Sequence, residues 1–390
     1  MKNGYRILDS DLHIFEPPDL WPKYIDSEFK HLAPICHEDH VRDFGITRPA
    51  GAAWGKPWTP PRAFTPRPDL ARAGTDGLGN GKTFNRDQLR YRHHHDQQWS
   101  PQVQLEAMDE EGIDVAMLYP SRGLLMLGED MDPRFAAAIA RAYNDWLYDF
   151  CKTDNDRLIG VAMISPFDIN DAVAETRRCT SELGFRGIFL KANILNGRAW
   201  HDPYYDPLWS TLEELDVPVG FHGPGGPAGT QFEYFQLSHV FYHPVEQQMA
   251  LASFCGAGIF ERHPRLRAAF LEGNCSWLPW LLWRLDEHWE LFGDVQYQTK
   301  LRPSEYFKRQ GYVSVDCEEN PVKYAIDYLG NDNIVFSTDF PHVDAQFPHS
   351  SDKFLQLPIS DEDKRKILWD NCATFYGARS TVAPLAASNV

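Results

Sequence analysis

Aspartate, glutamate and histidine side chains recur where apolar runs of this sequence end, and these residue types hold divalent metal ions in proteins. The residues at these run ends are Asp11, His13, His222, Glu272, Asp339 and His342. Residues two apart on a strand point to the same face, so Asp11 and His13 would project together. This pair is either half of a metal site or a hydrogen-bonded polar pair, and its spacing alone allows both.

Eight strands are expected to carry these ends, because short apolar runs alternate with helical patterns along the chain. The expected strands are 6–12, 115–119, 158–164, 185–190, 217–222, 266–271, 312–315 and 334–337. The expected helices are 133–154, 170–182, 206–215, 244–262, 276–292 and 361–375. Apolar strands separated by helices are typical of a parallel sheet covered on both faces. The sequence therefore predicts an α/β fold, a (β/α)8 TIM barrel with a long insertion after strand 1. An open doubly wound sheet is the alternative, but no G-x-G-x-x-G follows any strand.

One barrel domain is expected over residues 1–380, followed by a flexible tail at 381–390. Residues 22–100 interrupt the alternation and are rich in Pro, Gly, Arg and Trp. A connection of this length is usually functional or disordered. Its aromatic residues predict that it packs, so we expect an insertion at the barrel mouth.

Composition restricts the partners of the chain. The formal net charge of −17 argues against nucleic acid or an anionic membrane as the main partner. No apolar stretch is long enough to span a bilayer, and the N-terminus lacks a secretory pattern. Seven scattered Cys without a C-x-x-C pair fit reduced thiols. These features predict a cytoplasmic protein that acts on a small molecule.

The barrel would bring the polar strand ends together, because active sites of such barrels lie at the carboxyl ends of the strands. Strands one and eight are neighbours, so Asp11, His13 and Asp339 would lie close together, with His222 across the mouth. Any single strand-end Asp or His is more often a hydrogen-bonded structural residue. Four that converge predict a metal site.

The sequence resembles the amidohydrolase superfamily, in the branch that includes aminocarboxymuconate-semialdehyde decarboxylase and the aromatic-acid decarboxylases. The matching segments are "DSDLHIFEPPDLW", "MDEEGIDVAMLYP", "HDPYYDPLWSTLEELDVPVGFH", "HPRLRAAFLEGNCSWLPWLLWRLDE" and "FSTDFPHVD". The resemblance implies one divalent metal ion held by Asp11, His13, His222 and Asp339. Zinc is the first expectation, with manganese or iron as alternatives. A homodimer or homotetramer is implied as well.

Two positions depart from the pattern of the branch. Many relatives begin with His-x-His or Glu-x-His, whereas this chain has Asp11-x-His13. The decarboxylases carry a His at the end of strand six, where this chain has Glu272. Glu272 is expected to act as a general base, with the orienting of His222 as its alternative role.

Four further residues are candidates for the site. His243, next to Pro244, is expected to act as acid or base, or else to be a helix-start residue. His342 is expected to orient Asp339 or to contact substrate. Lys191 is expected to contact an anion, with carbamylation between two metal ions as the alternative that the resemblance suggests. Arg198 would bind a substrate carboxylate or pair with Asp202.

The main functional hypothesis is a metal-dependent hydrolase that attacks a small cyclic or aromatic substrate with metal-activated water. Its catalytic residues would be Glu272, His243 and Asp339, and its substrate contacts Arg198, His342 and Lys191. The first alternative is a nonoxidative, metal-dependent decarboxylase of an aromatic or unsaturated carboxylic acid. The second is a non-catalytic barrel with a structural metal ion.

Overall fold

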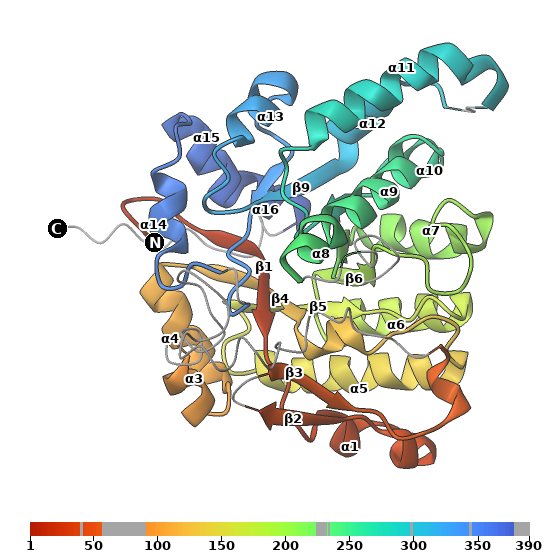
Figure 1. Cartoon of the computed structure of the whole chain (residues 1–390), viewed down its shortest axis with the longest axis vertical. Helices are drawn as coiled ribbons and strands as arrows, with labels where there is room; N and C mark the ends of the chain where they lie inside the picture. The colour runs from red at the N-terminus through yellow and green to blue at the C-terminus, as the bar shows by residue number, and fades with distance from the viewer. Residues whose placement is uncertain are drawn as a thin grey trace.

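Eight parallel strands form the centre of the protein. The structure is a computed structural model and describes residues 1–39, 42–56, 91–223, 232, 235–296, 299–342 and 345–377. The strands are β1 (Leu8–Ile14), β4 (Val115–Pro120), β5 (Leu158–Met163), β6 (Gly187–Lys191), β7 (Val219–His222), β8 (Ala268–Phe270), β9 (Gly311–Val315) and β10 (Ile334–Phe336). Their hydrogen-bonded order follows the chain from β1 to β10. Since β1 also lies beside β10, the sheet forms the predicted, nearly closed (β/α)8 barrel (Figure 1).

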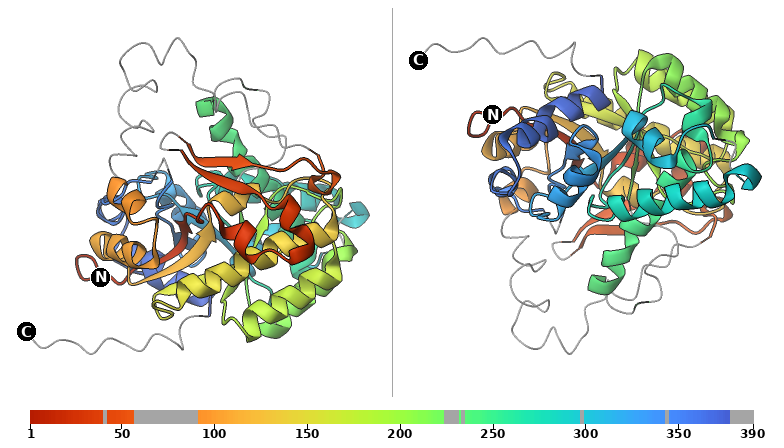
Figure 2. Two further views of the ribbon diagram at one scale, coloured as in Figure 1. Left: turned by 90° about the horizontal axis from the view of Figure 1, so that it is seen from below. Right: turned by 90° about the horizontal axis from the view of Figure 1, so that it is seen from above.

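Helices surround the strands, as the three views of the ribbon show (Figures 1 and 2). The first half of the barrel has α4 (Pro101–Glu111), η4 (Arg122–Leu125), α5 (Pro133–Cys151), α6 (Ile169–Ser181), η5 (Pro203–Tyr205) and α7 (Asp206–Leu215). The second half has α8 (Phe235–Tyr242), α9 (Pro244–Cys255), α10 (Ile259–Arg262), α11 (Leu278–Gln296), α12 (Pro303–Gln310), α13 (Val322–Leu329), α14 (Ser350–Leu355), α15 (Asp361–Arg365), η6 (Lys366–Asp370) and α16 (Asn371–Phe375).

Local sequence signals explain where several helices begin. The side chain of Asp132 accepts a hydrogen bond from the Phe135 amide at 3.0 Å, and Pro133 occupies the first turn of α5. Ser360 and Asp363 form the predicted capping box at the start of α15. Every residue of β4 is buried, as expected for a strand covered on both faces.

Two predicted helices are interrupted. The helix expected at 244–262 ends at Cys255 and resumes at Ile259, because Gly258 adopts a left-handed backbone with φ of 88°. The helix expected at 361–375 contains a π-helical segment, Lys366–Asp370, between two α-helical turns. Short-range patterns predicted the apolar periodicity of both segments but not these breaks.

The segment after β1 contains secondary structure that was not predicted. It includes α1 (Leu20–Tyr24), η1 (Ser27–Leu32), an antiparallel pair of strands β2 (Ile35–Asp39) and β3 (Arg42–Thr47), η2 (Ala52–Trp54) and α3 (Arg92–Asp96). Its last residues reach the carboxyl ends of the barrel strands. The rings of Tyr91 and Phe340 lie 5.5 Å apart, and those of Trp99 and Phe15 4.7 Å apart. The predicted tail at 381–390 and much of the insertion lie outside the described residues.

All seven cysteines are free and buried, in line with the expectation of reduced thiols. Among the described residues, no helix combines the length and apolar character needed to cross a lipid bilayer.

Candidate active site

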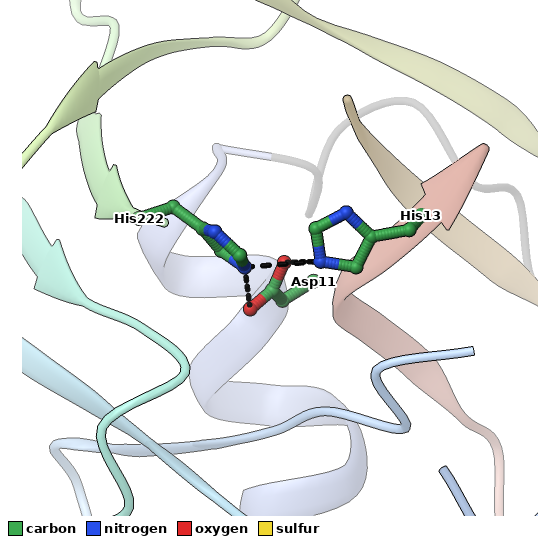
Figure 3. Close-up of side chains that lie close together, drawn as sticks. All are labelled: Asp11, His13 and His222. Carbon is green, nitrogen blue, oxygen red and sulfur yellow. Dashed lines mark hydrogen bonds and ion pairs between the residues drawn. The ribbon is translucent and has the colours of Figure 1, made fainter. Parts of the chain in front are cut away.

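Three buried side chains from β1 and β7 meet at the centre of the barrel mouth (Figure 3). Nε2 of His13 lies 3.0 Å from Nε2 of His222, which in turn lies 3.0 Å from Oδ2 of Asp11. Oδ1 of Asp11 is 3.4 Å from Nε2 of His13. All three residues are completely inaccessible to solvent. The ends of β1 and β7, the first and fifth barrel strands, therefore converge as predicted.

The segment after β10 adds a second carboxylate and a third imidazole. Oδ1 of Asp339 lies 3.1 Å from Nε2 of His13 and 2.8 Å from Nδ1 of His342. The rings of His13 and His342 stack with centroids 3.9 Å apart, and Nε2 of His342 is 3.1 Å from the Ser121 hydroxyl. Asp339 has a left-handed backbone with φ of 53°, a conformation that is uncommon for residues with a side chain.

Glu272 and His243 form the neighbouring part of the site. Oε2 of Glu272 lies 3.3 Å from Nδ1 of His222 and 2.8 Å from Nδ1 of His243. Glu272 also has a positive φ, 54°, and its amide donates to the Ser314 hydroxyl at 3.0 Å. Glu272, which follows the sixth barrel strand β8, thus lies beside both His222 and His243.

The ring nitrogens of His13 and His222 fit a shared cation. Nδ1 of His13 lies 2.8 Å from the carbonyl oxygen of Pro120, and a carbonyl only accepts, so Nδ1 carries the proton in neutral His13. Nε2 of His13 then presents a lone pair toward His222. A proton on Nδ1 of His222, directed toward Glu272, leaves a lone pair on Nε2 of that ring as well. In these tautomers the Nε2 atoms of both rings can bind one cation placed between them.

The carboxylates lead to the same conclusion. Both oxygens of Asp11 and Oδ2 of Asp339 are buried without a hydrogen-bond partner among the described residues. Asp11, His13 and His222 each offer a ligand atom within 4.8 Å of the others, as do His222, Glu272 and Asp339. An unsatisfied buried carboxylate is costly, and a divalent ion is the ligand that would satisfy several at once.

Burial and charge shift the pKa values of the cluster in opposite directions. Burial raises the pKa of Asp11 to about 7 and lowers that of His222 to about 3. Burial also lowers the pKa of His13, but Asp339 and Asp11 outweigh it and raise this pKa to about 10. Burial raises the pKa of Asp339 as well, yet His342 and His13 hold it well below the usual value. A position that favours a proton this strongly also favours a metal cation in its place.

His243 has a different electrostatic environment. Burial lowers its pKa, but the charge of Glu272 and the contact with it prevail, so the pKa of His243 is raised. Burial raises the pKa of Glu272 in turn, and the charges on His243 and His222 lower it overall. Glu272 and His243 therefore form an ion pair in which the imidazolium can release a proton.

A cavity of about 290 Å³ opens beside this ion pair. Its lining includes His243, Glu272, Asp339, Ser314 and Asn274. The cavity brings potential acid and base groups to the same space as the metal-binding cluster. This arrangement suits a small substrate, and Asp339 is the proposed ligand that lines the cavity.

Lys191 and Arg198 lie outside the cluster just described. Lys191 ends β6, next to His222 in the sheet register, and its Nζ donates to the Leu127 carbonyl at 3.3 Å. Burial lowers its pKa to about 7. Arg198 lies 3.5 Å from Asp202 and stacks on Tyr204, 4.7 Å from the ring centroid. Contact of either residue with substrate stays a prediction.

Sequence reasoning missed two residues that support the site. Asp9 is fully buried and accepts a hydrogen bond from the Thr338 hydroxyl at 2.5 Å. The signal was present in the spacing, because Asp9, Asp11 and His13 are successive alternate positions of one strand. Thr338 gave no such signal, since its partner is 329 positions away in the chain.

An eight-stranded parallel barrel with Asp and His side chains clustered at the carboxyl ends of its strands has the architecture of a barrel enzyme, in which catalytic groups lie at that end. Residues 91–378 match the family described as "Amidohydrolase", which covers well over half of the chain. The protein belongs to the amidohydrolase superfamily of enzymes, as the sequence resemblance predicted.

Several known relatives of this chain are decarboxylases, and another is a 2-keto-4-carboxy-3-hexenedioate hydratase of Sphingobium. The chain is 30% identical over 292 residues to a gamma-resorcylate decarboxylase of Rhodococcus jostii, covering 70% of this chain and 86% of the relative. A dihydroxybenzoic acid decarboxylase of Polaromonas, solved with bound manganese and the inhibitor 2-nitroresorcinol, is 25% identical with a TM-score of 0.65, covering 75% of this chain and 90% of that one. An amidohydrolase from Mycobacterium avium subsp. paratuberculosis shares the fold, with 23% identity, a TM-score of 0.75 and coverage of 96% and 100%. The decarboxylase alternative is better supported than the hydrolase that the sequence first suggested.

Proposed function

We propose that this protein is a metal-dependent, nonoxidative decarboxylase of an aromatic or unsaturated carboxylic acid. The observation that carries this proposal is the cavity that adjoins both the Asp/His cluster and the Glu272–His243 ion pair. The likeness to gamma-resorcylate decarboxylase over 70% of the chain supports the choice of reaction. A purely structural metal ion would need a closed site, whereas this cluster borders a cavity.

The proposed metal ligands are Asp11, His13, His222 and Asp339. Their unsatisfied oxygens and facing ring nitrogens support this assignment. The manganese in the Polaromonas relative favours manganese over the zinc or iron that we also considered. When bound, a divalent ion would supply positive charge that attracts the substrate carboxylate and polarises an adjacent oxygen.

Protein side chains would manage the proton. Decarboxylation breaks the bond between the ring carbon and the carboxylate, carbon dioxide leaves, and the ring carbon takes a proton in its place. His243 is the proposed donor, because it lines the cavity and Glu272 raises its pKa. Glu272 would stabilise the imidazolium before transfer, and Asp339 would help to orient the substrate from the other side of the cavity.

The hydrolase remains the second candidate because of one observation. The pKa of Glu272 is lowered by His243 and His222, so its carboxylate is available as a base for an attacking water. This property suits hydrolysis, in which a proton must first be removed.

Product analysis separates the two reactions. Manganese-loaded protein would be given 2,6-dihydroxybenzoate and related hydroxybenzoic acids, and in parallel aromatic esters and amides. We expect stoichiometric carbon dioxide and the corresponding phenol, with loss of the reaction after chelation and recovery on adding manganese back. Hydrolysis of the esters or amides without carbon dioxide release from any acid would overturn the decarboxylase proposal.

We also propose that two copies of the protein associate through α11 as a dimer. One face of α11 carries Trp280, Trp283 and Leu291, which are 55%, 47% and 69% exposed. Arg284 and Glu287 form a 2.8 Å ion pair between these apolar groups. An antiparallel, twofold pairing of α11 would set Arg284 against the partner's Glu287 and Trp280 against the partner's Leu291.

Sedimentation of the purified protein tests this surface. We expect a dimer for the wild type and a folded monomer for Trp280→Glu combined with Leu291→Glu. A wild-type monomer at micromolar concentration, or a dimer unaffected by the double substitution, would contradict the α11 pairing.

A further inference from the structure

Hydrogen bonds from side chains close the barrel between its first and last strands. The hydrogen-bonded sheet order begins with β1 and ends with β10. Across this seam, the Ser10 hydroxyl donates to the Phe336 carbonyl at 2.7 Å. The Ser337 hydroxyl donates to the Asp11 carbonyl at 3.1 Å. The seam matters because Asp11 and Asp339, both proposed metal ligands, enter the site from its two sides.

The carboxylate of Asp9 accepts hydrogen bonds across the seam. Its carboxylate accepts the Thr338 hydroxyl at 2.5 Å and the Thr338 amide at 3.3 Å. It also accepts the amide of Asp11 at 3.1 Å, within its own strand. The buried carboxylate of Asp9 therefore holds the backbone at Asp11, a proposed ligand. It also holds the backbone at Thr338, the residue before the second proposed ligand Asp339.

The strand is irregular at this point, so the backbone needs such support. The pairing of β1 with β4 shifts from Asp9 opposite Ala116 to Leu12 opposite Leu118, which leaves two residues of β1 against one of β4. Such a bulge disrupts the ladder and redirects side chains. The bond from the Asp11 amide to Asp9 satisfies a donor inside the bulge and fixes the direction of the Asp11 side chain.

The opposite side of the seam is strained as well. Asp339 has a φ of 53°, which persists in a residue with a side chain only when its neighbours determine it. Thr338 is held by Asp9 on one side of Asp339. On the other side, the His13 amide donates to the Phe340 carbonyl at 2.7 Å. The strained residue is thus held at both ends by β1.

We propose that Asp9 and Thr338 form a clasp across the β1–β10 seam that sets the separation of the Asp11 and Asp339 carboxylates. Asp9 and Thr338 are positioning residues in this view, because neither is a proposed ligand. The inference deepens the proposed function, in that it concerns two of the carboxylates proposed there as metal ligands.

Paired substitutions test the clasp. Thr338→Val removes the hydroxyl with little change in volume, and Thr338→Ser retains it. Asp9→Asn replaces one acceptor oxygen by a donor that faces backbone amides. Thr176→Val is the matched control, since the Thr176 hydroxyl is also buried and donates to the Ala172 carbonyl at 2.7 Å within α6.

Three readouts need no substrate. We expect Thr338→Val and Asp9→Asn to weaken Mn²⁺ binding by about tenfold and to shift the visible spectrum of the Co²⁺-loaded protein. Thr338→Ser should restore both to near wild-type values, and Thr176→Val should leave both unchanged. In metal-free protein, hydrogen exchange of peptides covering residues 8–14 and 334–340 should become faster in Thr338→Val and not in Thr176→Val.

Specific results would overturn the clasp. If hydrogen exchange of residues 8–14 and 334–340 is unchanged in Thr338→Val, the clasp is wrong whether or not the protein binds metal. Equal losses of metal affinity in Thr338→Val and Thr176→Val would also contradict it. Failure of Thr338→Ser to restore the Co²⁺ spectrum would also count against it. If the clasp results hold but no carbon dioxide is released from any acid, only the proposed reaction fails.

Discussion

Oε2 of Glu272 lies 2.8 Å from Nδ1 of His243 and 3.3 Å from Nδ1 of His222. One carboxylate oxygen therefore contacts both the proposed proton donor and a proposed metal ligand. Burial lowers the pKa of His243, but the charge of Glu272 outweighs it and raises this pKa. The same oxygen is close enough to His222 for the orienting role predicted from the sequence. The sequence resemblance predicts a histidine of the decarboxylases at the position of Glu272, and these two contacts would explain a carboxylate there.

Glu272→Gln should weaken metal binding by about tenfold and also change the pH profile. Activity requires protonated His243, so the rate falls as pH rises through the pKa of His243. Removing the Glu272 charge lowers that pKa, and the alkaline limb of kcat should move to lower pH. Glu213→Gln is the control, because Glu213 lies 3.5 Å from Nδ1 of His263 away from the cluster. An unmoved alkaline limb would contradict the role of Glu272.

His243→Asn should reduce kcat by about 10²–10⁴-fold while metal content stays at the wild-type level, since His243 is proposed to donate the proton and not to bind metal. Carbon dioxide release measures the loss of kcat, and elemental analysis of the same sample measures the metal content. Equal loss of metal and activity would show that His243 acts on the metal site.

Asp339→Asn should lose both metal and activity. The substitution replaces a carboxylate oxygen that no described donor satisfies with an amide group, which binds divalent ions less well. Asp316→Asn is the control, because Asp316 lines the same cavity without joining the Asp/His cluster. Full metal content in Asp339→Asn would exclude Asp339 as a ligand.

Lys191 predicts a pH dependence of stability. Burial lowers its pKa from 10.5 to about 7 in the folded chain, so the unfolded chain binds more protons between these values. The free energy of unfolding should therefore rise with pH across this window. Lys191→Met removes the cost of burying the charge and should stabilise the protein by a few kcal/mol near pH 6, with the difference shrinking toward pH 10. Denaturant unfolding at several pH values checks this, and a constant difference would contradict it.

The sequence predicted the barrel and its polar rim because both follow from short-range patterns. Apolar runs separated by helical periodicity locate the strands, and parallel strands place their carboxyl ends at one rim. Asp11, His13, His222 and Asp339 therefore converge as expected from residues up to 328 positions apart.

The unpredicted parts depend on long-range contacts. The spacing of Asp9 and Asp11 was visible in the sequence, but the contact of Asp9 with Thr338 was not, because the two residues are 329 positions apart. Arg198 resembles an anion-binding residue by its place in a loop, but in the structure it lies beside Asp202 and Tyr204. The strands β2 (ICHED) and β3 (RDFGIT) have two apolar residues each, too few to show the strand periodicity from sequence.

Anomalous diffraction at the manganese edge, from crystals grown with Mn²⁺, tests the central claim most directly. We predict one strong peak about 2.1 Å from Nε2 of His13, Nε2 of His222 and an oxygen of Asp11 and of Asp339. A peak that lies elsewhere, or a site that stays without anomalous density at saturating Mn²⁺, would contradict the metal centre and the chemistry derived from it.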